Sequence, residues 1–174
     1  MDVILLDLDM TLVHTTFDAC VPGYDLIPHP DMFIHVRPHT REFLTSLASY
    51  DKVAEVGFWT CGTPEYAQHV VRGLLDYASV QEWPSKILMT REDATSFNGI
   101  YVKDLELVKQ RYNLNNVVLV DDNTVHMTIP RNIPHIHIIE PFDVTKPDTA
   151  NDSILICLAQ RLLWRLFVTS FRLT

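Results

Sequence analysis

A short segment near the N-terminus, residues 3–17 with the sequence VILLDLDMTLVHTTF, most constrains what this chain can fold into. Its first four residues are apolar, and a near-continuous apolar run is typical of a strand buried on both faces of a parallel sheet. Asp7 and Asp9 follow at a spacing that puts both side chains on one side of an extended chain. If the strand ends near Asp7, both acids emerge at the carboxyl edge of the sheet, where ligands bind in open α/β folds.

Two carboxylates at such an edge suit a hard cation such as Mg²⁺, which takes one or two carboxylates and keeps several waters. The alternative is an ordinary strand that exposes Asp7 and Asp9 to solvent. The apolar neighbours at residues 4–6 and Leu8 favour a buried strand, and two acids do not stay buried and charged without a partner. We therefore favour the interpretation that Asp7 and Asp9 form a functional site at the edge of the sheet over the interpretation that they are two solvent-exposed acids.

The rest of the chain alternates predicted strands with predicted helices. Strands are expected over residues 53–60, 86–90, 100–102, 117–120 and 135–139, and helices over about 38–50, 64–77 and 104–113. This alternation predicts βαβ units, and hence an α/β fold with helices on both faces of a mostly parallel sheet. The segment 14–38 contains four prolines, and we expect it to form a small β-hairpin or flap after the first strand.

Length and composition limit the class of protein. The 174 residues are expected to form a single domain. A formal net charge of −8 argues against a general nucleic-acid-binding surface. The three cysteines are widely spaced and form no disulfide framework, and acids interrupt the N-terminal apolar segment, unlike in a signal peptide. We therefore expect an intracellular protein, in the nucleus or the cytoplasm.

Residues 152–174 predict a long apolar C-terminal helix. Three arginines interrupt its apolar residues, so no run approaches the roughly 20 residues that a membrane-spanning helix needs. Its first half is expected to pack on the sheet. Its second half carries Trp164, Phe167 and Phe171, which either wrap around the core or contact another subunit.

Reactive side chains follow several of the predicted strands and precede one helix. They are Asp7, Asp9, Thr11, Thr60, Lys103, Asp121 and Asp122. Because the carboxyl ends of parallel strands meet at one edge of a sheet, we expect these groups to lie together. A carboxylate nucleophile, a second carboxyl group, hydroxyls, an ammonium and metal-binding acids are the groups that phosphoryl transfer through an aspartyl-phosphate requires.

The same residues resemble the motifs of a known family. DLDMTLVH at residues 7–14 resembles the DxDxT signature of haloacid-dehalogenase (HAD) superfamily phosphatases. It is most similar to the form of this signature in the small phosphatases that act on the RNA polymerase II C-terminal domain, which are also called the NLI-interacting-factor-like family. WTCG at 59–62, YVKDL at 101–105 and LVDDN at 119–123 resemble the second, third and fourth motifs. The resemblance implies a HAD-type Rossmann-like α/β/α domain and a serine/threonine phosphatase dependent on Mg²⁺.

The resemblance also implies a role for each motif residue. Asp7 would attack the phosphorus atom, and Asp9 would protonate the departing oxygen and then accept a proton from water. Mg²⁺ would be held by Asp7, the backbone carbonyl of Asp9, and Asp122. The remaining catalytic residues would bind phosphate or support those that do. They are Thr11, which completes the signature, Thr60 and Lys103, which would hold phosphate oxygens, and Asp121, which would orient Lys103 or a metal-bound water.

Three residues are implied to bind the substrate. Phe17 corresponds to an aromatic side chain that lines a pocket for a proline of the peptide, and Arg91 to an arginine near the phosphoserine region; Tyr66 is grouped with them. The substrate would be a phosphoserine or phosphothreonine peptide, and the RNA polymerase II C-terminal domain is one candidate. The chain departs from the family at Met10, where Glu is usual, and at Thr63, where an apolar residue is usual.

Three functions are therefore compared. The first is a protein phosphatase, favoured because residues 12–59 leave room for a flap but not for a large cap over the site. The second is a binding module of the same fold that lacks catalysis, against which Asp9 and Lys103 both count. The third is a phosphatase of small molecules or nucleic-acid ends.

Overall fold

A five-stranded parallel sheet forms the centre of the protein. The computed structural model describes residues 2–49, 55–81, 83, 86–97 and 99–170. The sheet has the strand order β10-β9-β1-β5-β6, and every neighbouring pair is parallel. Its strands are β1 (Asp2–Leu6), β5 (Glu55–Trp59), β6 (Leu88–Met89), β9 (Asn116–Asp121) and β10 (Ile136–Ile138). The predicted α/β class is confirmed.

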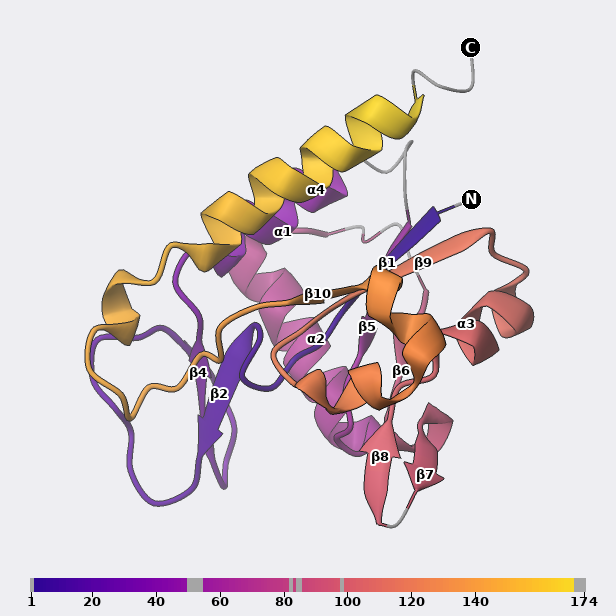
Figure 1. Cartoon of the computed structure of the whole chain (residues 1–174). Coiled ribbons are helices and arrows are strands. Elements are labelled where there is room, and N and C mark those ends of the chain that lie inside the picture. The colour runs from indigo at the N-terminus through magenta and orange to yellow at the C-terminus, as the bar shows by residue number, and fades with distance from the viewer. Residues whose placement is uncertain (1, 50–54, 82, 84–85, 98, 171–174) are drawn as a thin grey trace.

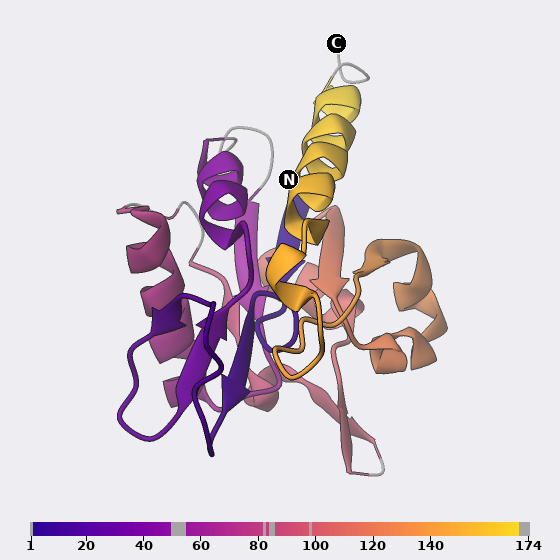
Figure 2. The same cartoon turned by 90° about the vertical axis from the view of Figure 1, so that its left-hand side faces the viewer.

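Helices cover both faces of this sheet (Figures 1 and 2). Because strand residues alternate faces, Ile4 and Leu6 pack in one apolar cluster, whereas Val3 and Leu5 pack in another. The first cluster includes side chains of α1 (Thr40–Ala48), α2 (Pro64–Ala78) and α4 (Ile154–Ser170), and the second includes side chains of α3 (Leu105–Tyr112). A strand that is buried on both sides explains the unbroken apolar run at the start of the sequence.

The segment after β1 is a small antiparallel sheet with one more strand than the predicted hairpin. Its order is β2-β4-β3, with β2 (Val13–Thr16), β3 (Leu26–Ile27) and β4 (Phe33–Val36). Farther along the chain, a second insertion forms the hairpin of β7 (Thr95–Phe97) and β8 (Ile100–Val102). Both lie beyond the carboxyl ends of the central strands, beside the predicted site (Figure 1).

Capping residues set the boundaries of α2 and α3, and α1 begins later than predicted. Thr63 accepts a hydrogen bond from the backbone N–H of Tyr66 and so caps α2. Asn113 ends α3 in the left-handed region, with φ 52°. Pro38, however, lies in a turn before α1 rather than in its first turn, because His39 adopts φ 65° and the helix begins at Thr40.

The first half of α4 packs on the core as predicted, with Leu155, Leu158 and Leu162 buried. The side chains of Trp164 and Phe167 and the whole of Phe171 lie outside the residues that the structure describes, as do Val53 and Ala54 of the expected second strand. Among the described residues, no helix combines the length and the apolar character needed to cross a bilayer.

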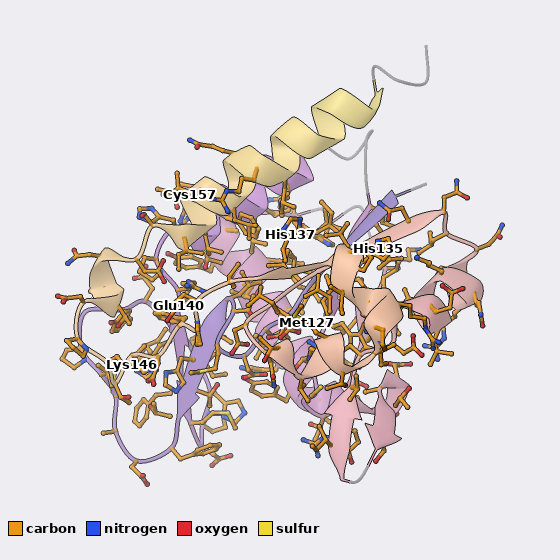
Figure 3. All side chains as sticks on the ribbon, viewed as in Figure 1. Met127, His135, His137, Glu140, Lys146 and Cys157 are labelled. Atoms are coloured by element: carbon orange, nitrogen blue, oxygen red, sulfur yellow. The ribbon has the colours of Figure 1, made fainter. Side chains whose placement is uncertain are left out.

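A buried arginine joins three segments that are far apart in the sequence. Arg37 is fully buried, and its guanidinium donates to the carbonyl of Thr11 at 2.9 Å and to that of Glu140 at 2.8 Å. Its Nε donates to Asp152 at 2.8 Å. Glu140 lies between β10 and α4 (Figure 3). Arg37 thus ties the loop after β1 to the start of the C-terminal helix.

Replacing Arg37 with methionine is expected to lower the free energy of unfolding by about 3–5 kcal/mol, because the largely buried Asp152 loses its partner and two carbonyls lose their donor. Denaturant-induced unfolding followed by circular dichroism measures the change. The matched control is Arg111→Met, since the Arg111 side chain pairs with Asp93 while half exposed and its loss should cost about 1 kcal/mol or less. Equal losses in the two variants would contradict the importance of this contact.

Candidate active site

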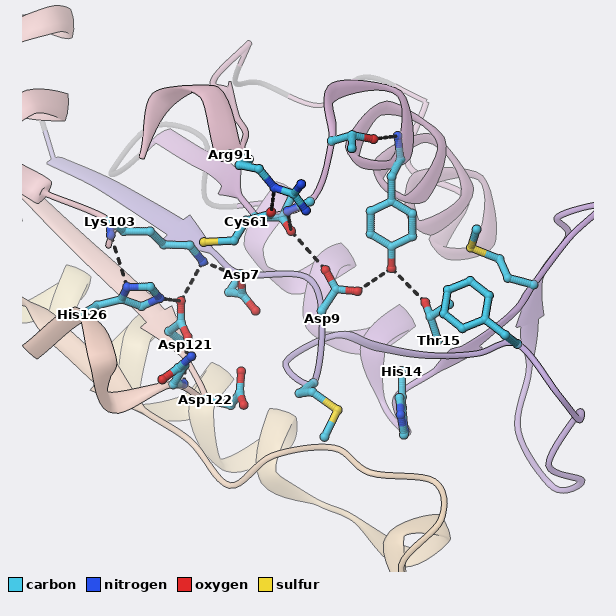
Figure 4. A pocket seen from close by; sticks show the side chains of 18 residues that line it. Asp7, Asp9, His14, Thr15, Cys61, Arg91, Lys103, Asp121, Asp122 and His126 are labelled. Carbon is cyan, nitrogen blue, oxygen red and sulfur yellow. Dashed lines mark hydrogen bonds and ion pairs between the residues drawn. The ribbon is translucent and has the colours of Figure 1, made fainter. Parts of the chain in front are cut away.

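The predicted reactive residues meet in one cavity at the carboxyl edge of the sheet (Figure 4). The cavity has a volume of about 630 Å³. Nine of the ten residues proposed from the sequence line it: Asp7, Asp9, Phe17, Thr60, Tyr66, Arg91, Lys103, Asp121 and Asp122. Seven of them come from the ends of β1, β5 and β9, from α2 and from the loop before α3, and the carboxyl ends of parallel strands meet at one edge of a sheet. The other two, Phe17 and Arg91, follow β2 and β6.

Lys103 lies between two carboxylates inside this cavity. Its ammonium donates to Asp7 Oδ1 and, at 2.7 Å, to Asp121 Oδ2. All three side chains are buried, with relative exposures of 1%, 8% and 2% for Lys103, Asp7 and Asp121. Lys103 directly precedes Asp104, which caps α3 by accepting from the N–H of Glu106. The cap thus fixes the backbone next to the lysine.

The charges in this group shift one another's pKa. Burial acts to lower the pKa of Lys103, but Asp7 and Asp121 outweigh it and raise the pKa above its ordinary value. Burial would raise the pKa of Asp121, but Lys103 and His126 bring it below the ordinary value. For Asp7, burial dominates and raises the pKa, while Lys103 opposes that effect. Lys103 is therefore a fixed positive charge beside Asp7.

A second layer of side chains holds Lys103 and Asp121 in place. The backbone N–H of Lys103 donates to His126 Nδ1 at 3.2 Å, so that the imidazole hydrogen sits on Nε2, 3.3 Å from Asp121 Oδ2. Asn132 is fully buried and donates to the carbonyls of Lys103 and His126 at 2.7 and 2.9 Å. It also accepts from the N–H of Leu105 at 3.2 Å. Both sides of the lysine backbone are thus fixed.

Asp9 lies on the other side of the cavity and accepts hydrogen bonds on both carboxylate oxygens. Thr60 donates to Oδ2 at 3.0 Å, and the Tyr66 hydroxyl donates to Oδ1. Thr60 in turn accepts from the backbone N–H of Gly62 at 2.9 Å. That Thr60 holds phosphate oxygens stays a prediction; in the structure its hydroxyl donates to Asp9.

Three acids form a group suited to a cation. Asp7, Asp121 and Asp122 each offer a carboxylate oxygen, and these atoms lie within 4.8 Å of one another. Burial and the charge of Asp121 raise the pKa of Asp122, so a cation would relieve the crowding of negative charge. Oxygen donors of this kind match the preference of Mg²⁺.

Two of the three predicted substrate-binding residues, Phe17 and Arg91, are exposed where they line the cavity. The third, Tyr66, is bonded to Asp9. Phe17 is 69% exposed and presents a large apolar surface. The Nε of Arg91 donates to the carbonyl of Cys61 at 2.8 Å, and its guanidinium lies over the ring of Tyr101. The cavity lining therefore includes an exposed aromatic side chain and an exposed cation.

The family model of NLI interacting factor-like phosphatases matches residues 2–167 of this chain. The chain belongs to this family. Comparison with curated proteins finds no match. Among solved structures it resembles Fcp1, an essential RNA polymerase II CTD phosphatase, with 22% identity and a TM-score of 0.55, covering 80% of this chain and 42% of that one.

A second solved structure is similar to the same extent. It is a variant of the fission yeast RNA polymerase II CTD phosphatase Fcp1 bound to beryllium fluoride, with 21% identity and a TM-score of 0.56. The match covers 95% of this chain and 50% of the Fcp1 chain. The chain thus spans half or less of the length of these neighbours, and at this identity the likeness establishes the shared fold alone.

Thr11, although part of the family signature, does not line the cavity. Its side chain is fully buried, and none of the described residues forms a hydrogen bond with its hydroxyl. Its backbone is used instead, since its carbonyl accepts from Arg37 and its N–H donates to Leu8 at 3.3 Å. Met10 makes the turn beside it with φ 61°.

Several residues that the sequence analysis did not single out belong to the site of this family member. His14, Met32, Cys61, Asn123 and His126 line the cavity, and Asn132 lies behind it. His126 and Asn132 follow the fourth motif within short 3₁₀ segments, Thr124–Thr128 and Pro130–His135. Such segments have no periodicity from which side-chain direction can be predicted. Only the closeness of these residues to Asp121 and Asp122 in the sequence pointed to the site.

Proposed function

We propose that the chain is a Mg²⁺-dependent protein serine/threonine phosphatase that acts through an aspartyl-phosphate on Asp7. The observation that supports this proposal best is the ion pair between buried Lys103 and Asp7. Asp9, which accepts hydrogen bonds from two hydroxyl groups, lines the same cavity. A carboxylate beside a fixed cation suits attack on a phosphate, since the cation offsets the charge of the incoming group. Membership of a phosphatase family supports the same reaction class.

In the first step, a carboxylate oxygen of Asp7 attacks phosphorus, and the bond between phosphorus and the serine or threonine oxygen breaks. Asp9 gives a proton to that departing oxygen. In the second step, water attacks phosphorus, the bond to Asp7 breaks, and Asp9 takes the proton of the water. Inorganic phosphate and the original Asp7 carboxylate are the products.

The other residues support these steps. Lys103 neutralises phosphate oxygens, and Asp121, which it already contacts at 2.7 Å, keeps its ammonium in position. Because the Thr60 hydroxyl is bonded to Asp9, we infer that Thr60 acts mainly by holding that acid. Mg²⁺ would be held by Asp7, Asp122 and the backbone carbonyl of Asp9, and when bound it would supply further positive charge for the phosphoryl group.

The substrate we propose is a phosphoserine or phosphothreonine segment of a protein. Phe17 and Arg91 line the cavity at exposed positions, and His14 and Thr15 of the small sheet β2-β4-β3 also line it. The described residues form no capping domain over the cavity. Such a site admits an extended peptide. A peptide like the RNA polymerase II C-terminal domain is one candidate, because both neighbouring structures are CTD phosphatases. The net charge of −8 gives no reason to propose direct binding to nucleic acid.

Two further proposals concern organisation. We propose that residues 1–174 act as one phosphatase domain, with 14–38 as the flap and 152–174 as the C-terminal helix. Self-association through that helix remains a prediction, because the side chains on which it depends lie outside the described part of the chain.

Purified protein with Mg²⁺ is expected to release phosphate from phosphoserine peptides, and Asp7→Asn is expected to lower kcat by about 10³-fold or more because the nucleophile is lost. Asp76→Asn, the same change on the exposed surface of α2, should leave kcat unchanged. Wild-type protein that hydrolyses neither phosphopeptides nor p-nitrophenyl phosphate would refute the enzyme and favour a binding module. A clear preference for nucleotides or sugar phosphates at matched concentration would instead refute the peptide substrate.

Asp122→Asn is expected to raise the Mg²⁺ concentration for half-maximal activity by about tenfold, because the cation loses a charged ligand. Binding to the folded state also raises stability, so Mg²⁺ should raise the Tm of the wild-type protein and raise that of the variant less. Differential scanning fluorimetry with Mg²⁺ titration measures this, with Asp76→Asn as control. An identical Mg²⁺ response in the wild-type protein and Asp122→Asn would argue against Asp122 as a ligand.

A further inference from the structure

Two hydroxyl groups bond to Asp9, and a third bonds to one of these two. Thr60 and Tyr66 each donate to one oxygen of its carboxylate, and the Tyr66 hydroxyl also lies 2.8 Å from Thr15 Oγ1. A carboxylate only accepts hydrogen bonds, so while Asp9 is ionised Tyr66 donates to it and Thr15 donates to Tyr66. The order of donation is then Thr15 to Tyr66 to Asp9 (Figure 4).

The position of Tyr66 is built by the chain around it. Its backbone N–H bonds to the capping residue Thr63 in the first turn of α2. Its ring lies directly against Gly62, where an added Cβ would come within 2.7 Å of Tyr66 Cδ1. A glycine at this position thus allows the ring to approach the loop and to place its hydroxyl on Asp9.

We propose that Tyr66 is a positioning residue for Asp9, holding the carboxyl group for proton transfer, with Thr15 as the alternative partner of its hydroxyl. This inference rests on the proposed function and assigns Tyr66 a task other than contact with the substrate. It acts through Asp9, which exchanges the proton with the reacting oxygen.

Thr15 provides a second partner for the Tyr66 hydroxyl, 2.8 Å away, when proton transfer uses Oδ1 of Asp9. When Asp9 holds a proton on Oδ1, that oxygen no longer needs the Tyr66 hydrogen, and the Tyr66 hydroxyl can turn to donate to Thr15 Oγ1. Either atom of the Thr15–Tyr66 pair can be the donor. When Asp9 has given its proton to the departing oxygen, the hydroxyl returns to Asp9. No hydrogen is gained or lost by Tyr66 or Thr15.

The Tyr66 hydroxyl itself stays protonated. Burial and the neighbouring Asp9 carboxylate raise the pKa of Tyr66 above its ordinary value, so at neutral pH the residue is a hydrogen-bond donor and not a base. The role proposed here needs only the direction of its O–H group.

The test compares two substrates of similar size that differ in how much they need a general acid. Phenyl phosphate has a poor leaving group, whereas p-nitrophenyl phosphate releases a stabilised anion without much help. Tyr66→Phe is expected to lower kcat for phenyl phosphate about tenfold and for p-nitrophenyl phosphate about threefold or less, because only the first depends strongly on a well-placed Asp9. Thr15→Val should show the same selectivity with a smaller loss.

The matched control is Tyr77→Phe. Tyr77 lies on the same helix and also donates its hydroxyl to a carboxylate, that of Asp25 at 2.8 Å, but it does not line the cavity. This variant should keep both activities, and melting temperatures would confirm that all variants fold. An equal loss on both substrates, a rise in KM alone, or no loss in Tyr66→Phe would overturn the positioning role. Inactivity of the wild-type protein on both substrates would instead refute the proposed phosphatase.

Discussion

The structure depends on one buried ammonium group held between two carboxylates. Taking charges out of water costs several kcal/mol for each ion, and close opposite charges offset that cost only when the geometry is fixed. Lys103, Asp7 and Asp121 meet this condition because β1 and β9 are adjacent parallel strands, and because His126 and Asn132 hold the backbone around Lys103. The arrangement leaves a positive charge beside a carboxylate at the base of an open cavity.

Because β1 lies next to β9, the two acids that follow β1 have different surroundings. Asp7 lies beside an ammonium and the acids of β9, whereas Asp9, two residues later, lies among the hydroxyls of Thr60, Tyr66 and Thr15. Two carboxyl groups on one loop are therefore suited to two tasks. The loop that carries them is held by Arg37, whose contacts reach from Thr11 to the C-terminal helix. The fold thus supports the site from outside the cavity.

Much of the fold and of the site could be predicted from the sequence, because a reactive residue at the end of a predicted parallel strand has a known place in the fold. The apolar runs before Asp7 and Asp121 indicated buried parallel strands, and such strands bring their ends together. Thr60 and Lys103 were expected at the same edge from their places after a strand and before a helix, and the family motifs added a role for each. The contacts of single side chains were not predictable: Thr11 does not line the cavity, the Thr60 hydroxyl bonds to Asp9, and Asn132 bonds to the carbonyl of Lys103. These contacts depend on the conformations of loops, which have no repeating pattern of apolar and polar residues from which they could be predicted.

Trapping the covalent intermediate tests the central proposal most directly. Protein mixed with a phosphoserine peptide and Mg²⁺ would be quenched in acid within a turnover, reduced with borohydride and digested, and the fragment containing Asp7 examined by mass spectrometry. Reduction of an aspartyl-phosphate converts the aspartate to homoserine, so the account predicts that change at Asp7 and only after exposure to substrate. Phosphate release without any modified Asp7, or with the modification at Asp9, would contradict it.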